Sequence, residues 1–127
     1  MNKETKNWLE MVDYDLTTAN SMLKTGRYVY VIFMCHLAIE KAFKVIICNK
    51  NKQIPPKTHD LIYLLKLSNI QLTEKLLDFL GMINNVSVVT RYPEDFPKLI
   101  QSYPKKIAKQ YLDKTREIIQ CLRKDNT

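Results

Sequence analysis

The segment from Tyr28 to Cys48 is apolar on nearly every side, and this limits the folds open to the chain more than any other feature. The segment is too long for an ordinary strand, so it indicates a helix. A helix that is hydrophobic all round is buried all round. His36, Glu40 and Lys44 interrupt it, which leaves its apolar run well short of the ~20 residues that a membrane span needs. We therefore expect a soluble protein with a buried helix here.

Glycine is scarce: the 127 residues include only Gly26 and Gly81, whereas average usage of roughly 7% would give about nine. Few glycines mean few tight turns, which disfavours a sandwich, a barrel or a glycine-rich phosphate loop. Apolar residues instead recur at helical spacing in three further long segments and one short one. These are Thr5–Thr25, Thr73 to about Val86, Lys105–Arg123 and, as the short one, Leu61–Leu67.

The fold class that follows is all-α: an up-and-down bundle of four long helices plus one short helix, in a single domain spanning residues 1–127. Gly26 suits the left-handed position after the first helix. Thr58 or Asp60 can cap the short helix, and Thr73 the next one. The stripe predicted to face the core from that helix is Leu76, Leu77, Leu80 and Ile83. Three prolines prevent residues 91–104 from forming regular helix throughout.

The formal net charge is +7, and most of the excess lies in residues 98–127, which hold eight basic and three acidic side chains. One interpretation is a solvated helix face that keeps the protein in solution. The other is a surface for nucleic acid or an acidic protein partner. The N-terminal residues are polar rather than signal-like, and three cysteines are an odd number without metal-type spacing. We expect a cytoplasmic protein, with no membrane partner.

His36, Glu40 and Lys44 are spaced i, i+4 and i+8, so they form one line along the buried helix. Partly buried charges need partners, so Glu40 and Lys44 can pair with each other or with Asp15 of the first helix. The functional alternative is a polar groove between the first two helices that holds a phosphate or nucleotide. Neither His36 nor His59 has the acidic residue three positions earlier that a helical metal site needs, so we expect no metal and no cofactor.

Arg91, Tyr92 and Pro93 follow the fourth predicted helix in a proline-constrained loop. Glu94 and Asp95 are near enough in sequence to neutralise Arg91. Otherwise its guanidinium is well suited to hold a phosphate with two parallel hydrogen bonds. Thr58, His59 and Asp60 are typical of a helix start, and a catalytic role for His59 is the alternative.

Taken together, four pieces of the sequence resemble the HEPN domain family, and the resemblance covers nearly the whole chain. The pieces are Trp8 with Asp15-Leu16, the run Cys35–Lys44, the run Pro56–Leu61, and Arg91-Tyr92-Pro93. The resemblance implies a helical bundle that forms a homodimer and that is frequently paired with a nucleotidyltransferase in a toxin–antitoxin arrangement. Many members of this family are metal-independent ribonucleases with an Arg-x(4–6)-His motif after the fourth helix.

This chain keeps the arginine of that motif as Arg91, but no histidine follows it. Loss of a general acid or base typically costs about 10²- to 10⁴-fold in rate. We therefore expect a non-catalytic domain that binds a nucleotide or substrate for a nucleotidyltransferase, with Arg91, Tyr92, Lys44 and Glu40 as ligand contacts. The alternative is a ribonuclease toxin with a degenerate motif, in which Arg91 works with His59.

Overall fold

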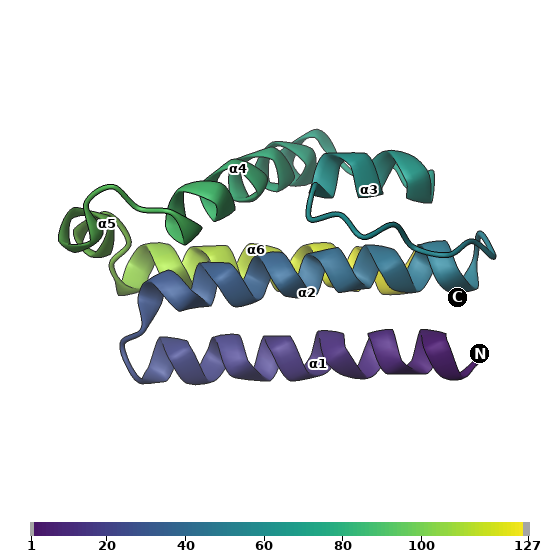
Figure 1. Ribbon diagram of the computed structural model, residues 1–127, viewed down its shortest axis with the longest axis horizontal. Helices are drawn as coiled ribbons and strands as arrows, with labels where there is room; N and C mark the ends of the chain where they lie inside the picture. Colours follow the sequence, from purple (N-terminus) through teal and green to yellow (C-terminus); the bar gives the residue numbers. More distant parts are fainter. Residues whose placement is uncertain (1, 126–127) are drawn as a thin grey trace.

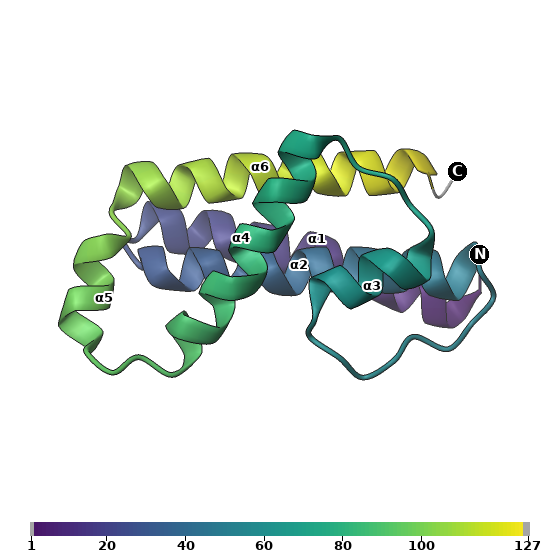
Figure 2. The same cartoon turned by 90° about the horizontal axis from the view of Figure 1, so that it is seen from above.

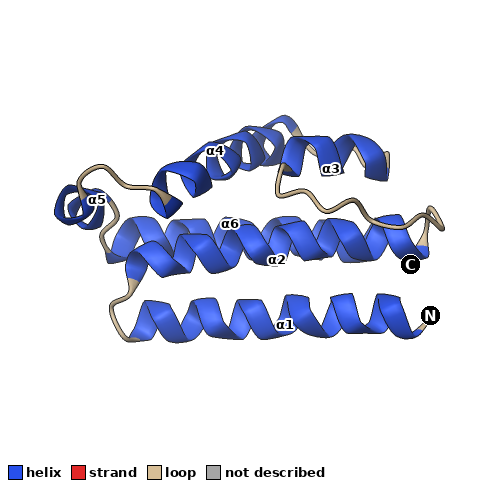
Figure 3. Cartoon of the chain, in the orientation of Figure 1, coloured by secondary structure: helices blue, strands red, loops and turns tan. Residues whose placement is uncertain are grey.

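The computed structural model describes residues 2–125, and these form six helices and no strand (Figure 3). The all-α prediction is confirmed for this range, whereas Met1, Asn126 and Thr127, at the ends of the expected domain, lie outside it. The helices are α1 (Lys3–Lys24), α2 (Tyr28–Asn49), α3 (Leu61–Ser68), α4 (Glu74–Arg91), α5 (Phe96–Ser102) and α6 (Lys105–Asp125).

Helix α2 lies at the centre, where it contacts each of the other five helices (Figure 1). Ile32, Ile39, Phe43 and Ile46 are all buried in the core around it. The prediction of a helix buried on every side is thus confirmed, although Tyr30 in its first turn is exposed. Within residues 2–125, no helix combines the length and the apolar character that crossing a membrane requires.

The helices are arranged in two layers rather than as a regular up-and-down bundle. Helices α1, α2 and α6 run along the long axis, while α3 and α4 cover one side of them (Figure 1). Figure 2 shows that α4 crosses α2 and α6 obliquely and that α5 closes one end. The predicted count of four long helices and one short helix is therefore wrong by one, because it omits α5.

Helix α5 forms although its second residue is Pro97. A proline in the first turn is tolerated because the missing N–H would have no partner within the helix. Asp95 caps this turn, since its carboxylate accepts a hydrogen bond of 3.2 Å from the Lys98 backbone N–H. The prolines of residues 91–104 thus interrupt the helical path without abolishing it.

Helix α4 ends at Arg91, five residues beyond the predicted end near Val86. Its last turns are rich in β-branched residues, which have modest helix propensity. Ser87 and Thr90 donate hydrogen bonds to backbone carbonyls three residues earlier, so their hydroxyl groups are satisfied within the helix. Arg91 therefore belongs to a helix end and not to a loop. Leu77, predicted to face the core, is exposed instead.

The predicted helix ends are largely confirmed. Asp60, rather than Thr58, is the N-cap of α3, and Thr73 is the N-cap of α4. Gly26 follows α1 with a φ of 81°, which is a left-handed conformation. Gly81, by contrast, lies inside α4.

The two glycines predict opposite responses to alanine. Gly26→Ala places a Cβ in a left-handed conformation and should lower the free energy of unfolding by about 1–2 kcal/mol. Gly81→Ala should raise it by up to about 1 kcal/mol, because glycine weakens a helix interior and the described part of the chain leaves open space around the added methyl group. Urea unfolding measures both values, and shifts of the same sign would contradict this account.

Candidate functional site

His59 reaches back from the segment before α3 to the middle of α2. Its Nδ1 lies 2.7 Å from Glu40 Oε1, and the other carboxylate oxygen of Glu40 accepts a hydrogen bond of 3.0 Å from Lys44 Nζ. Lys44 in turn lies 5.4 Å from the ring centre of Trp8 in α1. Glu40 thus connects the buried helix to the segment that carries His59.

The Glu40 contact orients the His59 ring. An ionised carboxylate only accepts hydrogen bonds, so Nδ1 must carry the proton of this pair. When the ring is neutral, its Nε2 keeps a lone pair that can accept a proton. The His59 side chain is 64% exposed, whereas that of Glu40 is only 5% exposed. A buried carboxylate therefore supports an accessible imidazole.

Asn84 of α4 holds the start of α3 in place. Its Oδ1 accepts a hydrogen bond of 3.0 Å from the Leu61 N–H, and its Nδ2 donates one of 3.1 Å to Asp60 Oδ1. The same Asp60 oxygen caps α3 through the Ile62 N–H at 3.1 Å. These bonds fix the residues next to His59 against α4.

Arg91 is brought to the same place by the last turn of α4. Its guanidinium lies 5.5 Å from the ring centre of Phe33 in α2, a cation–π arrangement. A pocket of about 360 Å³ opens beside it, which we call the His59–Arg91 pocket. Its lining residues are His59, Asp60, Asn84, Asn85, Ser87, Val88, Arg91 and Tyr92.

His36 lies buried near these groups. Burial lowers the pKa of His36, the Glu40 carboxylate raises it, and the positive charge of Arg91 lowers it further. Asn84 also approaches the ring and raises the pKa. Among residues 2–125, however, neither ring nitrogen has a partner with normal hydrogen-bond geometry. His36 is thus a neutral, unsatisfied imidazole near the pocket.

The structure brings together some of the residues singled out from the sequence and separates others. Arg91, Tyr92 and His59 line one pocket, although His59 precedes Arg91 by all of α3 and the length of α4. Glu40 and Lys44 are buried and bonded to each other, and they are absent from the lining of this pocket. The expected alternative in which these two residues pair is thus the observed one.

Asp15 pairs with Lys41 at 2.6 Å, rather than with Glu40 or Lys44. This ion pair joins α1 to α2 at the position where a polar groove was the alternative expectation. Asp60, Asn84, Asn85 and Ser87 were not singled out as pocket residues from the sequence. The adjacent amides of Asn84 and Asn85 in the middle of the helix were the available signal.

No group of three His, Cys, Asp or Glu side chains within the described range could hold a metal ion. The pocket instead offers a guanidinium, an imidazole, side-chain amides and an exposed phenol, together with the Asp60 carboxylate, whose Oδ1 already accepts hydrogen bonds from Ile62 and Asn84. These groups can bind an anion and an aromatic ring, and the imidazole can accept or donate a proton.

His36 predicts a specific pH dependence of stability. Its pKa in the folded state is below the unfolded value of about 6.5, so the unfolded chain binds the proton more readily. The resulting stability is present above about pH 6.5 and is lost as the pH falls from there through the lower pKa of the folded state. His36→Leu should remove this loss and be at least as stable as the unsubstituted protein at pH 8, because it replaces an unsatisfied buried polar group. Urea unfolding from pH 8 to pH 5 measures the free energy of unfolding of both proteins. If the difference between their free energies stays constant over this range, the prediction is contradicted.

Comparison with known proteins supports the fold and identifies the family. The TT1696 protein of Thermus thermophilus has a TM-score of 0.82 and 23% identity, with 98% of each chain covered. ST0689, described as an archaeal HEPN homologue, has a TM-score of 0.79 and 18% identity, with 100% of each chain covered. At these identities the structures show the fold alone. No curated protein matches the chain. The family model for the HEPN domain matches residues 5–125, nearly the full length, and the chain therefore belongs to the HEPN domain family.

Proposed function

We propose that this protein is a non-catalytic HEPN domain that binds a nucleotide or a phosphodiester in the His59–Arg91 pocket, as the substrate-binding partner of a nucleotidyltransferase. The observation that carries the proposal is that Arg91, His59 and Tyr92 line one pocket. An arginine matches the geometry of phosphate oxygens through two parallel hydrogen bonds. Tyr92 is 80% exposed, so its ring is available for a base to stack on.

The position of Arg91 makes its charge essential to this binding. It is the last residue of α4, where the carbonyl oxygens at the helix end carry partial negative charge. Without a cation, that end would repel a phosphate. The Phe33 ring beneath the guanidinium leaves its planar edge available for a ligand. One arginine at such a site suits a ligand with a single negative charge, such as an internal phosphodiester.

The partner, the toxin–antitoxin pairing and the homodimer belong to the same proposal. Family membership supports them, because these are the associations that the resemblance implies. Exposed apolar residues in the last turns of α4 and in α5 also suit a protein partner or a second copy of the chain. These residues are Val88, Val89, Phe96 and Ile100. RNA is a ligand of the same chemical class, because its backbone consists of phosphodiesters.

Arg91→Ala should abolish most of the binding of ApA, a dinucleotide whose only phosphate is the internal diester. Loss of a hydrogen-bonded charge should weaken binding roughly 10- to 100-fold. Isothermal titration calorimetry at low salt measures the dissociation constant. Arg116→Ala is the matched control, because it removes an exposed arginine from α6 and should leave binding unchanged.

Equal binding of ApA to Arg91→Ala and to the unsubstituted protein would refute the placement of the ligand. The partner role is tested by co-purification with each nucleotidyltransferase of the same genome. A protein that ignores both the dinucleotide and every such enzyme would overturn the proposal as a whole.

A ribonuclease is the second candidate function, and the His59–Glu40 contact favours it. A buried carboxylate at 2.7 Å holds the imidazole, and the exposed ring faces the same pocket as Arg91. In such a mechanism His59 Nε2 takes the proton of a ribose 2′-hydroxyl as that oxygen attacks the phosphorus. The P–O5′ bond breaks to leave a 2′,3′-cyclic phosphate, and the departing 5′-oxygen takes up a proton from water. Arg91 stabilises the negative charge that builds up on the phosphate oxygens.

If this second function operates, overexpression should inhibit growth and degrade RNA. His59→Ala and Arg91→Ala should each restore growth and lower the cleavage rate of the purified protein about 10²- to 10⁴-fold in the presence of EDTA. Growth curves and RNA gels measure these effects. A non-toxic protein without cleavage activity would exclude the ribonuclease and leave the binding role.

A further inference from the structure

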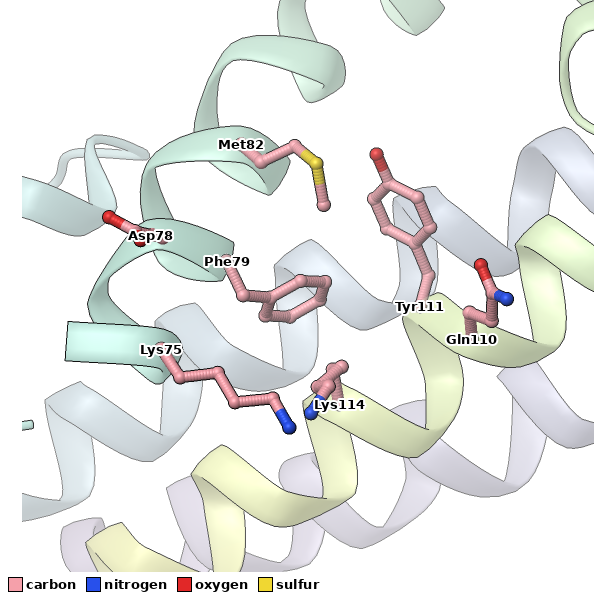
Figure 4. Close-up of a pocket in the computed structure, with 7 residues that line it drawn as sticks. All are labelled: Lys75, Asp78, Phe79, Met82, Gln110, Tyr111 and Lys114. Atoms are coloured by element: carbon pink, nitrogen blue, oxygen red, sulfur yellow. The ribbon is translucent and has the colours of Figure 1, made fainter. Parts of the chain in front are cut away.

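A second pocket, of about 450 Å³, lies between α4 and α6 and shares no residue with the His59–Arg91 pocket. Four of its lining residues come from α4 and three from α6 (Figure 4). Its volume falls within the ~300–1,000 Å³ range that is typical of small-molecule sites. We call it the α4–α6 pocket.

The wall of the α4–α6 pocket is aromatic. The ring centres of Phe79 and Tyr111 are 5.5 Å apart at an interplanar angle of 63°, and both residues are buried. Figure 4 shows these rings and the Met82 side chain around one open space. Met82 is 47% exposed and lies at its rim. Such a surface suits a flat aromatic ring, because edge-to-face contacts and a polarisable sulfur favour it.

Two lysines lie at one side of the same pocket. The side chains of Lys75 and Lys114 point toward each other, and their ammonium groups lie close together (Figure 4). The contact between the two amino groups lowers the pKa of Lys75 and raises the pKa of Lys114. Glu117 pairs with Lys114 at 3.3 Å, and its charge also raises the pKa of Lys75, although Lys75 has no carboxylate within ion-pair distance in residues 2–125. Asp78, on the same helix as Lys75, points away from the two lysines in Figure 4.

Two adjacent positive charges repel each other, and an anion bound between them relieves that repulsion. A carboxylate would neutralise one ammonium group, whereas a terminal phosphate carries nearly two negative charges at pH 7 and has three oxygens to accept hydrogen bonds. The lysines and the aromatic wall line the same pocket, so one ligand can contact both. The ligand that matches both features is an aromatic or nucleoside phosphate monoester.

We propose that the α4–α6 pocket binds a phosphate monoester with a flat aromatic group, which packs against Phe79, Met82 and Tyr111 while the phosphate lies between Lys75 and Lys114. This chemistry is found in a free nucleoside monophosphate and in the 5′-phosphorylated end of an RNA. The site is independent of the His59–Arg91 pocket, and it does not require the function proposed there.

Phenyl phosphate is the probe, because it contains the two recognised groups and little else. Titration calorimetry of the full chain at low salt should detect one site. Lys75→Gln and Lys114→Gln should each weaken binding roughly 10- to 100-fold, as expected for loss of a charged hydrogen bond. Lys109→Gln is the matched control: it removes an exposed lysine of α6 that pairs with Asp113, and it should bind as the unsubstituted protein does.

Two further arms test the aromatic wall and the separation of the sites. Inorganic phosphate should bind at least about tenfold more weakly than phenyl phosphate, since it buries no ring. Arg91→Ala should bind phenyl phosphate with the affinity of the unsubstituted protein, even though its binding of ApA is weakened. Circular dichroism should show that the lysine variants keep their helical content, so that a loss of binding is a loss of contact.

The proposal is overturned if phenyl phosphate fails to bind at millimolar concentration, or if it binds the lysine variants as tightly as the unsubstituted protein. Equal affinity for inorganic phosphate would remove the role of the aromatic wall, and loss of binding in Arg91→Ala would assign the probe to the other pocket. Adenosine monophosphate and a short RNA with a 5′-phosphate then distinguish the biological sources. The ligand that binds more tightly identifies the biological source, and binding of either ligand supports the site.

Discussion

The Glu40 carboxylate lies in the middle of a helix that five others surround, and Lys44 and His59 hold it there. An isolated buried carboxylate would cost several kcal/mol, so its partners are part of the fold. Lys44 is one turn further along the same helix, so its pairing with Glu40 requires no particular arrangement of the other helices. His59 comes from outside α2, so satisfying Glu40 fully requires the segment before α3 to return to the centre of the molecule. The position of His59 follows from this one group, while Asn84 and the buried Leu61 and Leu64 hold α3 beside it.

Helix α2 supports the candidate site at two points, one beneath each charged group. Glu40 lies behind His59, and Phe33 lies beneath Arg91. These two α2 residues are seven positions apart, which is two helical turns, so they share a face. Asn84 completes the arrangement from α4 by fixing the first residues of α3. The pocket therefore combines residues of α4 with non-helical residues, His59 among them, that contacts to α2 and α4 hold in place, which is what a preorganised binding site requires.

The sequence predicted those features that arise from local physics. The all-round apolar pattern identified α2 as buried, and single residues such as Gly26 and Thr73 marked helix ends correctly. Helix α5 was missed because a proline normally signals interruption, although its first turn tolerates one. The contact between His59 and Glu40 could not be derived, since it depends on how a connection of irregular structure folds back over α2. A pattern along one helix contains no information about a partner nineteen residues away.

The net charge of +7 also has a different meaning once the charges are located. On α6, Lys109, Lys114 and Arg123 pair with Asp113, Glu117 and Asp13, so part of its basic face is matched within the molecule. The two pockets instead use cations at opposite ends of α4, Lys75 in its first turn and Arg91 at its last residue. The helix dipole makes these ends unequal, because backbone N–H groups attract an anion at the first and carbonyl oxygens repel it at the second. Arg91 must offset that repulsion before it attracts a ligand, whereas Lys75 and Lys114 add to a favourable field. The pocket at the start of α4 is therefore suited to the more highly charged phosphate.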